Sequence, residues 1–126
     1  MYVETNKVFQ STAGNIAITS SGSGGAYVYG KLIAANSEAN PTSGGTITIN
    51  ATGTNAPGLE LDTGSLIAHG PIAITALNTS ADHSFRFKGA SGAILSNGNI
   101  TIQGGNSTGA TGTWGVTMYG GRTIQS

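Results

Sequence analysis

The stretch GGTITIN, residues 44–50, alternates threonine and isoleucine directly after two glycines. Near copies of it begin at three other glycines, as GNIAIT at Gly14, GPIAIT at Gly70 and GNITIQ at Gly98. Alternation of apolar and polar residues is typical of a β-strand with one buried face. The chain is therefore predicted to contain the same short strand four times.

Two further alternating segments follow each of these strands. The second segments are YVY (27–29), LEL (59–61), FRF (85–87) and VTM (116–118). The third segments each begin with a glycine and are GKLIA (30–34), GSLIA (64–68), GAILS (92–96) and GRTIQ (121–125). The units recur at unequal offsets of 25 to 31 residues, which indicates connecting turns of variable length.

A repeat of roughly 20 to 50 residues indicates a solenoid, a propeller or an array. A propeller blade needs four strands, whereas each unit here has three, and an up-and-down β-sandwich remains an alternative. We predict an all-β fold, namely a right-handed parallel β-helix (solenoid) with three short strands per coil. About four full coils (14–44, 45–70, 71–98 and 99–126) would follow a partial N-terminal coil (1–13). Residues 1–126 would then form a single β-helix segment, a fragment of a longer repeat protein.

Period-two alternation sends alternate side chains inward, so stacked coils build ladders of buried residues. The second strands are predicted to contribute Tyr29, Leu61, Phe87 and Met118. The third strands are predicted to contribute either Leu32, Leu66, Ile94 and Thr123 or Ile33, Ile67, Leu95 and Ile124. In the partial coil, Met1 and Val3 are aligned with Leu59 and Leu61, and Val8 and Phe9 with Leu66 and Ile67. The predicted core consists of Ile16, Ile18, Ile47, Ile49, Ile72, Ile74, Ile100, Ile102, Leu59, Leu61, Phe85, Phe87, Val116 and Met118.

The same alignment gives four charged residues structural partners. Glu60 and Arg86 occupy one outward position on adjacent coils, and Asp62 and Lys88 occupy another. Opposite charges that face each other across neighbouring strands contribute about 0.2–1 kcal/mol each. The sequence therefore predicts two cross-coil salt bridges.

The composition excludes several classes of function. Of the 126 residues, 21 are glycine and none is cysteine, and the formal net charge is zero. Only five Lys and Arg residues are present, too few to cluster against a nucleic-acid backbone or an anionic membrane surface. No apolar run reaches the roughly 20 residues of a membrane helix. We therefore expect neither a nucleic-acid partner nor membrane insertion.

Residues suited to catalysis or metal binding are few. A polysaccharide-cleaving enzyme needs grouped carboxylates, and the single close pair, Glu60 and Asp62, already has predicted cross-coil partners. His69 and His83 fall in predicted turns without a ligand partner at short spacing. We expect no enzymatic activity, no metal ion and no cofactor.

Aromatic and threonine residues offer two kinds of contact surface. Trp114, in the longest predicted loop, and Tyr119 are candidates for stacking on a sugar ring. Thr48, Thr75 and Thr101 are predicted to stack on one outer face, as expected of an ice-binding surface.

The strings GNIAIT, GGTITIN, GSLIAHG and NGNITIQGG resemble the β-helical shafts of large secreted bacterial exoproteins. The resemblance is strongest to filamentous-haemagglutinin-like adhesins of two-partner secretion, extends more loosely to autotransporter passengers, and covers nearly the whole chain. It implies secretion through an outer-membrane pore, display at the cell surface and attachment to a receptor or glycan on host or neighbouring cells. It carries over no catalytic or binding residues.

The leading hypothesis is thus a structural and adhesive segment of a secreted or surface-displayed bacterial β-helix protein. The alternatives are a fragment of a polysaccharide-acting β-helix enzyme or phage tailspike, and an ice-binding solenoid. The segment begins in mid-coil and shows no capping helix, so unpaired strand edges at both ends predict end-to-end self-association.

Overall fold

A computed structural model describes residues 1–80, 82–106 and 115–126, and in these the chain forms parallel strands and no helix. The strands make three sheets, which we name A, B and C. Sheet A contains β1 (Tyr2–Val3), β4 (Ala26–Val28), β7 (Leu59–Asp62), β10 (Phe85–Lys88) and β13 (Val116–Met118). Sheet B contains β2 (Val8–Gln10), β5 (Lys31–Ala34), β8 (Ser65–Ala68), β11 (Ala93–Ser96) and β14 (Thr123–Gln125). Sheet C contains β3 (Ile16–Gly22), β6 (Ile47–Gly53), β9 (Ile72–Asn78) and β12 (Ile100–Asn106).

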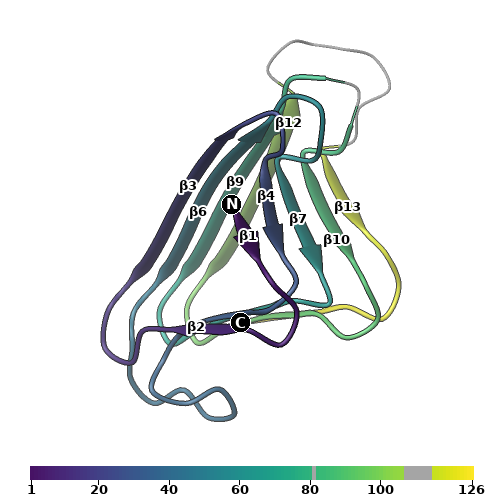
Figure 1. Cartoon of the computed structure of the whole chain (residues 1–126). Coiled ribbons are helices and arrows are strands. Elements are labelled where there is room, and N and C mark those ends of the chain that lie inside the picture. The colour runs from purple at the N-terminus through teal and green to yellow at the C-terminus, as the bar shows by residue number, and fades with distance from the viewer. Residues whose placement is uncertain (81, 107–114) are drawn as a thin grey trace.

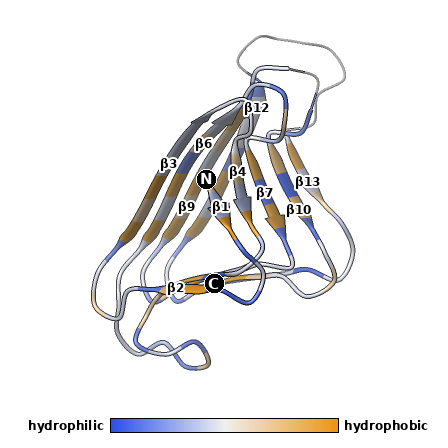
Figure 2. Ribbon diagram, in the orientation of Figure 1, coloured by the Kyte–Doolittle hydropathy of each residue, from blue (hydrophilic) through white to orange (hydrophobic). Residues whose placement is uncertain are grey.

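The chain passes through sheets C, A and B in turn and then returns to C one layer further along. Figure 1 shows the three sheets as the sides of a triangle, and Figure 2 shows hydrophobic residues along the strands with hydrophilic ones at the corners. This confirms the prediction of an all-β solenoid with three parallel strands per coil and about four turns.

The interior is filled by the inward residues of all three sheets. Ile16, Ile47, Ile72 and Ile100 lie in one register across sheet C, and Ile18, Ile49, Ile74 and Ile102 lie in the next. Sheet A adds Leu59, Leu61, Phe85 and Phe87, each of which has 0% exposure. Burial of such a side chain contributes roughly 1.5–3 kcal/mol, so these ladders are the main source of stability.

Val116 and Met118 differ from the predicted core. They lie in register with Phe85 and Phe87, but each is 45% exposed. The reason is that β13 has β10 on one side and no described strand on the other. Both residues are therefore inward-facing but only half covered.

The prediction that Tyr29 continues the ladder of Leu61 is wrong. Val28 is the residue opposite Leu61, and Tyr27 is opposite Glu60, so the segment YVY turns its tyrosines outward. A tyrosine hydroxyl needs a hydrogen-bond partner when it is buried, and the apolar interior offers none. On the outside, the Tyr29 hydroxyl donates to the Glu60 carboxylate.

The sheet B register agrees with the first predicted ladder at Leu32, Leu66 and Ile94 and differs from it at the last strand. Leu32, Leu66, Ile94 and Ile124 form the inner ladder, and Thr123 instead lies opposite Ala93. In the partial coil, Phe9 lies over Leu32 and so continues the ladder of Leu66, whereas Val8 lies over Lys31. The predicted alignment of Val8 and Phe9 was therefore shifted by one residue, and Ile124 is not in the row of Ile33. A shift of one residue moves every side chain of a strand to the opposite face.

An asparagine ladder closes the corner between sheets C and A. Asn78 has 0% exposure and lies opposite Asn106 in the register of sheet C. The side-chain amide of Asn78 donates to the Ala56 carbonyl at 2.6 Å, and that of Asn106 donates to the Ser80 carbonyl at 3.1 Å. Each asparagine thereby satisfies a turn carbonyl one coil away, which a buried polar group requires.

Candidate functional site

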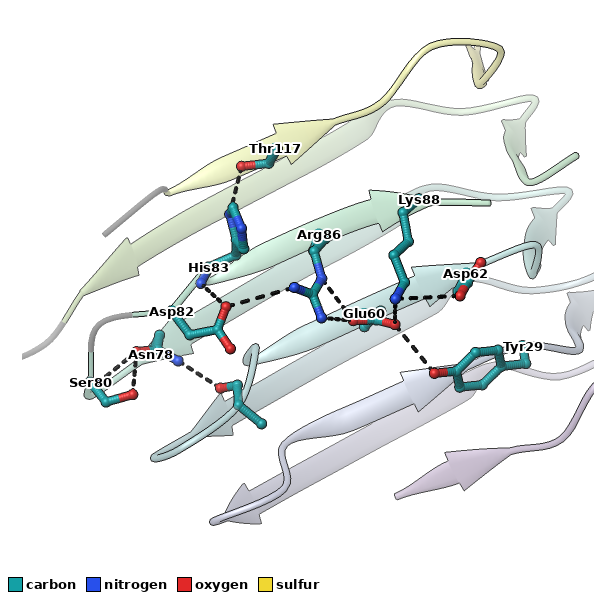
Figure 3. Close-up of polar contacts among 11 residues, drawn as sticks. Tyr29, Glu60, Asp62, Asn78, Ser80, Asp82, His83, Arg86, Lys88 and Thr117 are labelled. Atoms are coloured by element: carbon teal, nitrogen blue, oxygen red, sulfur yellow. Dashed lines mark hydrogen bonds and ion pairs between the residues drawn. The ribbon is translucent and has the colours of Figure 1, made fainter. Parts of the chain in front are cut away.

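The outer face of sheet A carries a charged cluster centred on Glu60. The register sets Glu60 opposite Arg86 and Asp62 opposite Lys88, so the structure brings together all four predicted cross-coil residues. Glu60 faces away from the core, yet its side chain is only 1% exposed. Arg86 and Lys88 reach over it from β10, and Tyr29 reaches it from the other side, as Figure 3 shows.

Both carboxylate oxygens of Glu60 are occupied. Arg86 donates to Oε2 from Nε at 2.7 Å and also from Nη2. Lys88 Nζ lies 2.9 Å from Oε1, which also accepts the Tyr29 hydroxyl at 3.2 Å. Lys88 is closer to Glu60 than to Asp62, whose Oδ2 lies 3.6 Å away. Both predicted pairs therefore form, and Lys88 also reaches Glu60, so that two cations converge on one buried carboxylate.

The electrostatics favour the charged forms of these side chains. Burial raises the pKa of Glu60, but hydrogen bonds from Lys88 and Arg86, together with their charges, outweigh it and hold this pKa below its ordinary value. Burial lowers the pKa of Arg86, but its bonds to Glu60 reverse this and raise it. An ionised carboxylate with both oxygens occupied is poorly suited to proton transfer and well suited to joining adjacent coils.

The two histidines each connect coils. His83 Nδ1 lies 2.9 Å from Thr117 Oγ1, and the His83 amide donates to Asp82 at 2.7 Å. His69 Nδ1 lies 3.3 Å from the Pro41 carbonyl. Across the described residues, no group of three or more His, Asp or Glu side chains is arranged to hold a metal ion.

Three tyrosines form an aromatic cluster beside the charged one. The ring centre of Tyr2 lies 6.5 Å from that of Tyr27 and 5.2 Å from that of Tyr29. Tyr27 and Tyr29 are stacked at 6.3 Å with an angle of 7° between their planes. Tyr2 is 60% exposed, so this surface is open to a ligand. Sequence reasoning missed the cluster because it assigned Tyr29 to the core.

Of the two aromatic residues that the sequence predicted as sugar contacts, the structure describes one. Tyr119 is 47% exposed just after β13, and its amide donates to the Phe87 carbonyl. Trp114 lies outside the described residues.

A groove of about 1050 Å³ lies on the outer face of sheet B. Its floor is formed by outward side chains of β8 and β11, namely Ser65, Ile67, Ala93 and Leu95. One wall is formed by the turns between sheets A and B, including Asn6, Gly30, Thr63 and Ser91. The other wall contains Glu38 and Ala39 from a loop between β5 and β6. We call this feature the sheet B groove.

The loop that forms this second wall is residues 36–44, visible below sheet B in Figure 1. Asn36 holds it closed: its Oδ1 accepts the amides of Thr42 at 3.1 Å and Ser43 at 3.2 Å, and its Nδ2 donates to the Thr42 hydroxyl. The loop closes through a bridge between Ala35 and Gly44. Gly44 has a φ of 144°, and a Cβ added there would lie 2.5 Å from the Ala34 carbonyl oxygen. This position therefore requires glycine.

Contacts across several coils fix the loop against sheet B. Glu38 forms an ion pair with Lys31, and the Pro41 carbonyl accepts the side-chain amide of Asn97 at 2.7 Å. Beside the loop, Ile33 and Ile67 form a second apolar cluster with Ala35, separate from the interior core. The wall is thus held by both polar and apolar contacts.

The predicted threonine ladder is wrong. Thr48 lies opposite Ala73, and Ala73 lies opposite Thr101, whereas Thr75 lies opposite Asn50 and Gln103. The three threonines share an outer face but occupy two different rows. Alanine interrupts one row, so the flat array that motivated the ice-binding alternative does not form.

The chain matches no protein-family model, no curated protein and no solved structure. The solenoid fold therefore rests on the structure itself, and the resemblance to haemagglutinin-like exoproteins stays a prediction. Within the part of the chain that the structure describes, no helix is long and apolar enough to cross a membrane.

Proposed function

We propose that this chain is a non-enzymatic structural and adhesive segment of a secreted or surface-displayed bacterial protein, and that it attaches to a receptor or glycan on host or neighbouring cells. The observation that most supports the proposal is the pair of contact surfaces on the outer faces of the stack, the tyrosine cluster and the sheet B groove. Contact groups on regular strands are held more accurately than those on loops.

The architecture suits a spacer as well as a binding surface. Each coil of a solenoid contacts only its neighbours, so length can be added without a new kind of core. The Glu60 cluster joins β7 and β10 to Tyr29, directly after β4, by side-chain contacts in addition to the backbone ladder. The carboxylates thereby strengthen the stack, while the aromatic rings and the groove remain available for recognition.

Attachment is tested with beads coated with the folded chain. The beads are mixed with epithelial cells and, separately, with bacterial cells, and bound beads are counted by flow cytometry. Beads coated with the same protein after heat unfolding serve as the control. We expect the folded chain to bind cells and the unfolded chain not to. Equal counts for the two preparations on every cell type would refute an adhesive role.

We also propose that copies of the chain associate end to end. Among the described residues, the exposed large hydrophobic side chains all lie at the two ends of the stack: Met1, Tyr2, Val8 and Phe9 at one, and Val116, Met118, Tyr119 and Ile124 at the other. Continuing the register from copy to copy would set Val3 on Met118 and Phe9 on Ile124.

The strand counts indicate that this association is weak. Sheets A and B have five described strands each and sheet C has four, so stacked copies leave one strand position in sheet C unfilled. Light scattering should show a mass that rises with concentration. Phe9→Lys should abolish the rise, whereas Val8→Lys, on the outward row, should not. A mass that stays monomeric at all concentrations would count against the proposal.

A further inference from the structure

We propose that the sheet B groove binds an extended acidic polysaccharide. The inference rests on the proposed adhesive function and names the ligand class and the place where it binds. Three features of the groove carry it, namely its shape, its charge and the chemistry of its lining.

The shape fits a chain. Val8, Lys31, Ser65 and Ala93 lie in one register on β2, β5, β8 and β11, and all four line the groove. The groove therefore crosses three strand spacings, a length of about 14 Å at about 4.8 Å per spacing. A span of this length accommodates a few linked units placed end to end.

The charge favours an anion. Lys7, Lys31 and Glu38 are the charged residues that line the groove, so its lining carries one net positive charge. Lys31 is paired with Glu38, whereas Lys7 has no ion pair among the described residues. Lys7 is exposed in the turn between β1 and β2, where an incoming carboxylate can reach it.

The lining favours a sugar over a peptide. Thr5, Asn6, Thr63 and Ser91 offer hydroxyl and amide groups along the rim, while the half-buried Leu95 gives the floor an apolar patch. Sugar rings present hydroxyls at their edges and C–H groups on their faces, which matches this arrangement. An extended peptide would gain most by adding as a strand, but β5 and β8 already pair on both sides within sheet B.

Glu38 should reduce the affinity of the groove for a polyanion. It neutralises Lys31 at the wall, so a polyanion must compete with it for that cation. Glu38→Gln should therefore raise the affinity for an acidic chain, because the net charge of the lining rises from one to two. A purely structural role for Glu38 predicts the opposite, since loss of the ion pair would loosen the wall.

The experiment measures binding of oligogalacturonate to the folded chain by calorimetry, with dextran oligomers of equal length as a neutral probe and polyglutamate as a non-sugar polyanion. We expect oligogalacturonate to bind most tightly. Ala93→Trp fills the floor from outside the core and should weaken binding at least about tenfold, while Ala93→Ser should leave it unchanged. Lys7→Ala should weaken it about 2- to 5-fold, the range of one exposed ion pair, and Lys7→Arg should not.

Several results would overturn the inference. These are equal binding of dextran, equal binding of polyglutamate, or unchanged binding by a folded Ala93→Trp variant. The cell assay separates the two proposals. If cells bind wild-type and Ala93→Trp beads equally and oligogalacturonate does not bind, the groove assignment fails and the adhesive function stands. If oligogalacturonate binds in the groove but no cell type binds the beads, the adhesive function fails and the groove assignment stands.

Discussion

Replacement of Glu60 by glutamine tests whether the buried carboxylate joins the coils. The change keeps the shape of the side chain and removes the charge that Arg86 and Lys88 share. Loss of one partner of a fully buried pair costs about 3–5 kcal/mol, and loss of an exposed pair about 0.2–1 kcal/mol. The side chains of Arg86 and Lys88 are 23% and 39% exposed, so water can hydrate both cations partly. We therefore expect a loss of about 2 kcal/mol in the free energy of unfolding at pH 7.

The lowered pKa of Glu60 also determines the direction in which its contribution to stability changes with pH. The pKa of Glu60 is lower in the folded chain than its ordinary value, so the contribution is fully present above the ordinary carboxyl pKa. It is lost as the pH falls through the lowered value in the folded chain. The stabilities of wild type and Glu60→Gln should therefore converge on acidification.

Urea unfolding followed by circular dichroism, from pH 7 to about pH 2, measures both effects. Asp62→Asn is the matched control, because Asp62 lies on the same strand and only 3.6 Å from Lys88 but is more exposed, and it should cost about 0.5 kcal/mol. A double-mutant cycle should give stronger coupling of Glu60 to Arg86 than to Lys88. A loss below about 0.5 kcal/mol for Glu60→Gln, or a loss that does not shrink at low pH, would refute the reasoning.

Three further predictions use the same unfolding measurement. Phe87→Ala should cost about 3–5 kcal/mol, because the ring has 0% exposure, whereas Met118→Ala on the half-covered end should cost about 1 kcal/mol; equal costs would contradict the core assignment. Asn78→Ala should cost about 1–3 kcal/mol, and Asn78→Asp should also destabilise because it removes the amide donor; a neutral effect of both would exclude the ladder. Gly44→Ala should destabilise by more than about 1 kcal/mol, while Gly24→Ala, with no atom near its added Cβ, should change little.

The sheet C ladder was predictable because its signal is redundant. Each copy has two isoleucines separated by one residue, and a slip by one position would expose both. The charges on β7 and β10 added an independent check, since Glu60 opposite Arg86 is compatible with only one register. Strong alternation and a charge match therefore determine a strand register without any three-dimensional information.

The tyrosines of sheet A were not predictable from alternation alone. In YVY, both the tyrosines and the central valine are apolar enough to face inward, so the pattern leaves the face undecided. The deciding fact is chemical: Tyr27 lies in the row of Glu60, which faces out. Extending the outward row of Glu60 to the preceding coil would have predicted that Tyr27 and Tyr29 face outward.

Sheet B was ambiguous for a related reason. Its strands contain two adjacent large apolar residues, such as Leu32 and Ile33, and both faces of the sheet are covered there. The useful signal was Lys31, which must face out and so directs Leu32 inward. In the sequence, only the longer spacing between Ile16 and Ile47 indicated the covering loop. Nothing in the composition of the loop predicted where it would lie.

The loop and the groove follow from one requirement of the fold. Once Leu32 and Leu66 point inward, Ile33 and Ile67 point outward and would be exposed on sheet B without a cover. The loop 36–44 lies against this outer side, where Pro41 contacts β8 and β11 through His69 and Asn97 just after them. The neighbouring row contains the small side chains of Ser65, which is 8% exposed, and Ala93. The loop over one row therefore rises beside a row of small side chains, and Glu38 and Ala39 of the loop form the wall of the groove. The covered apolar row and the wall of the groove therefore arise from the same insertion.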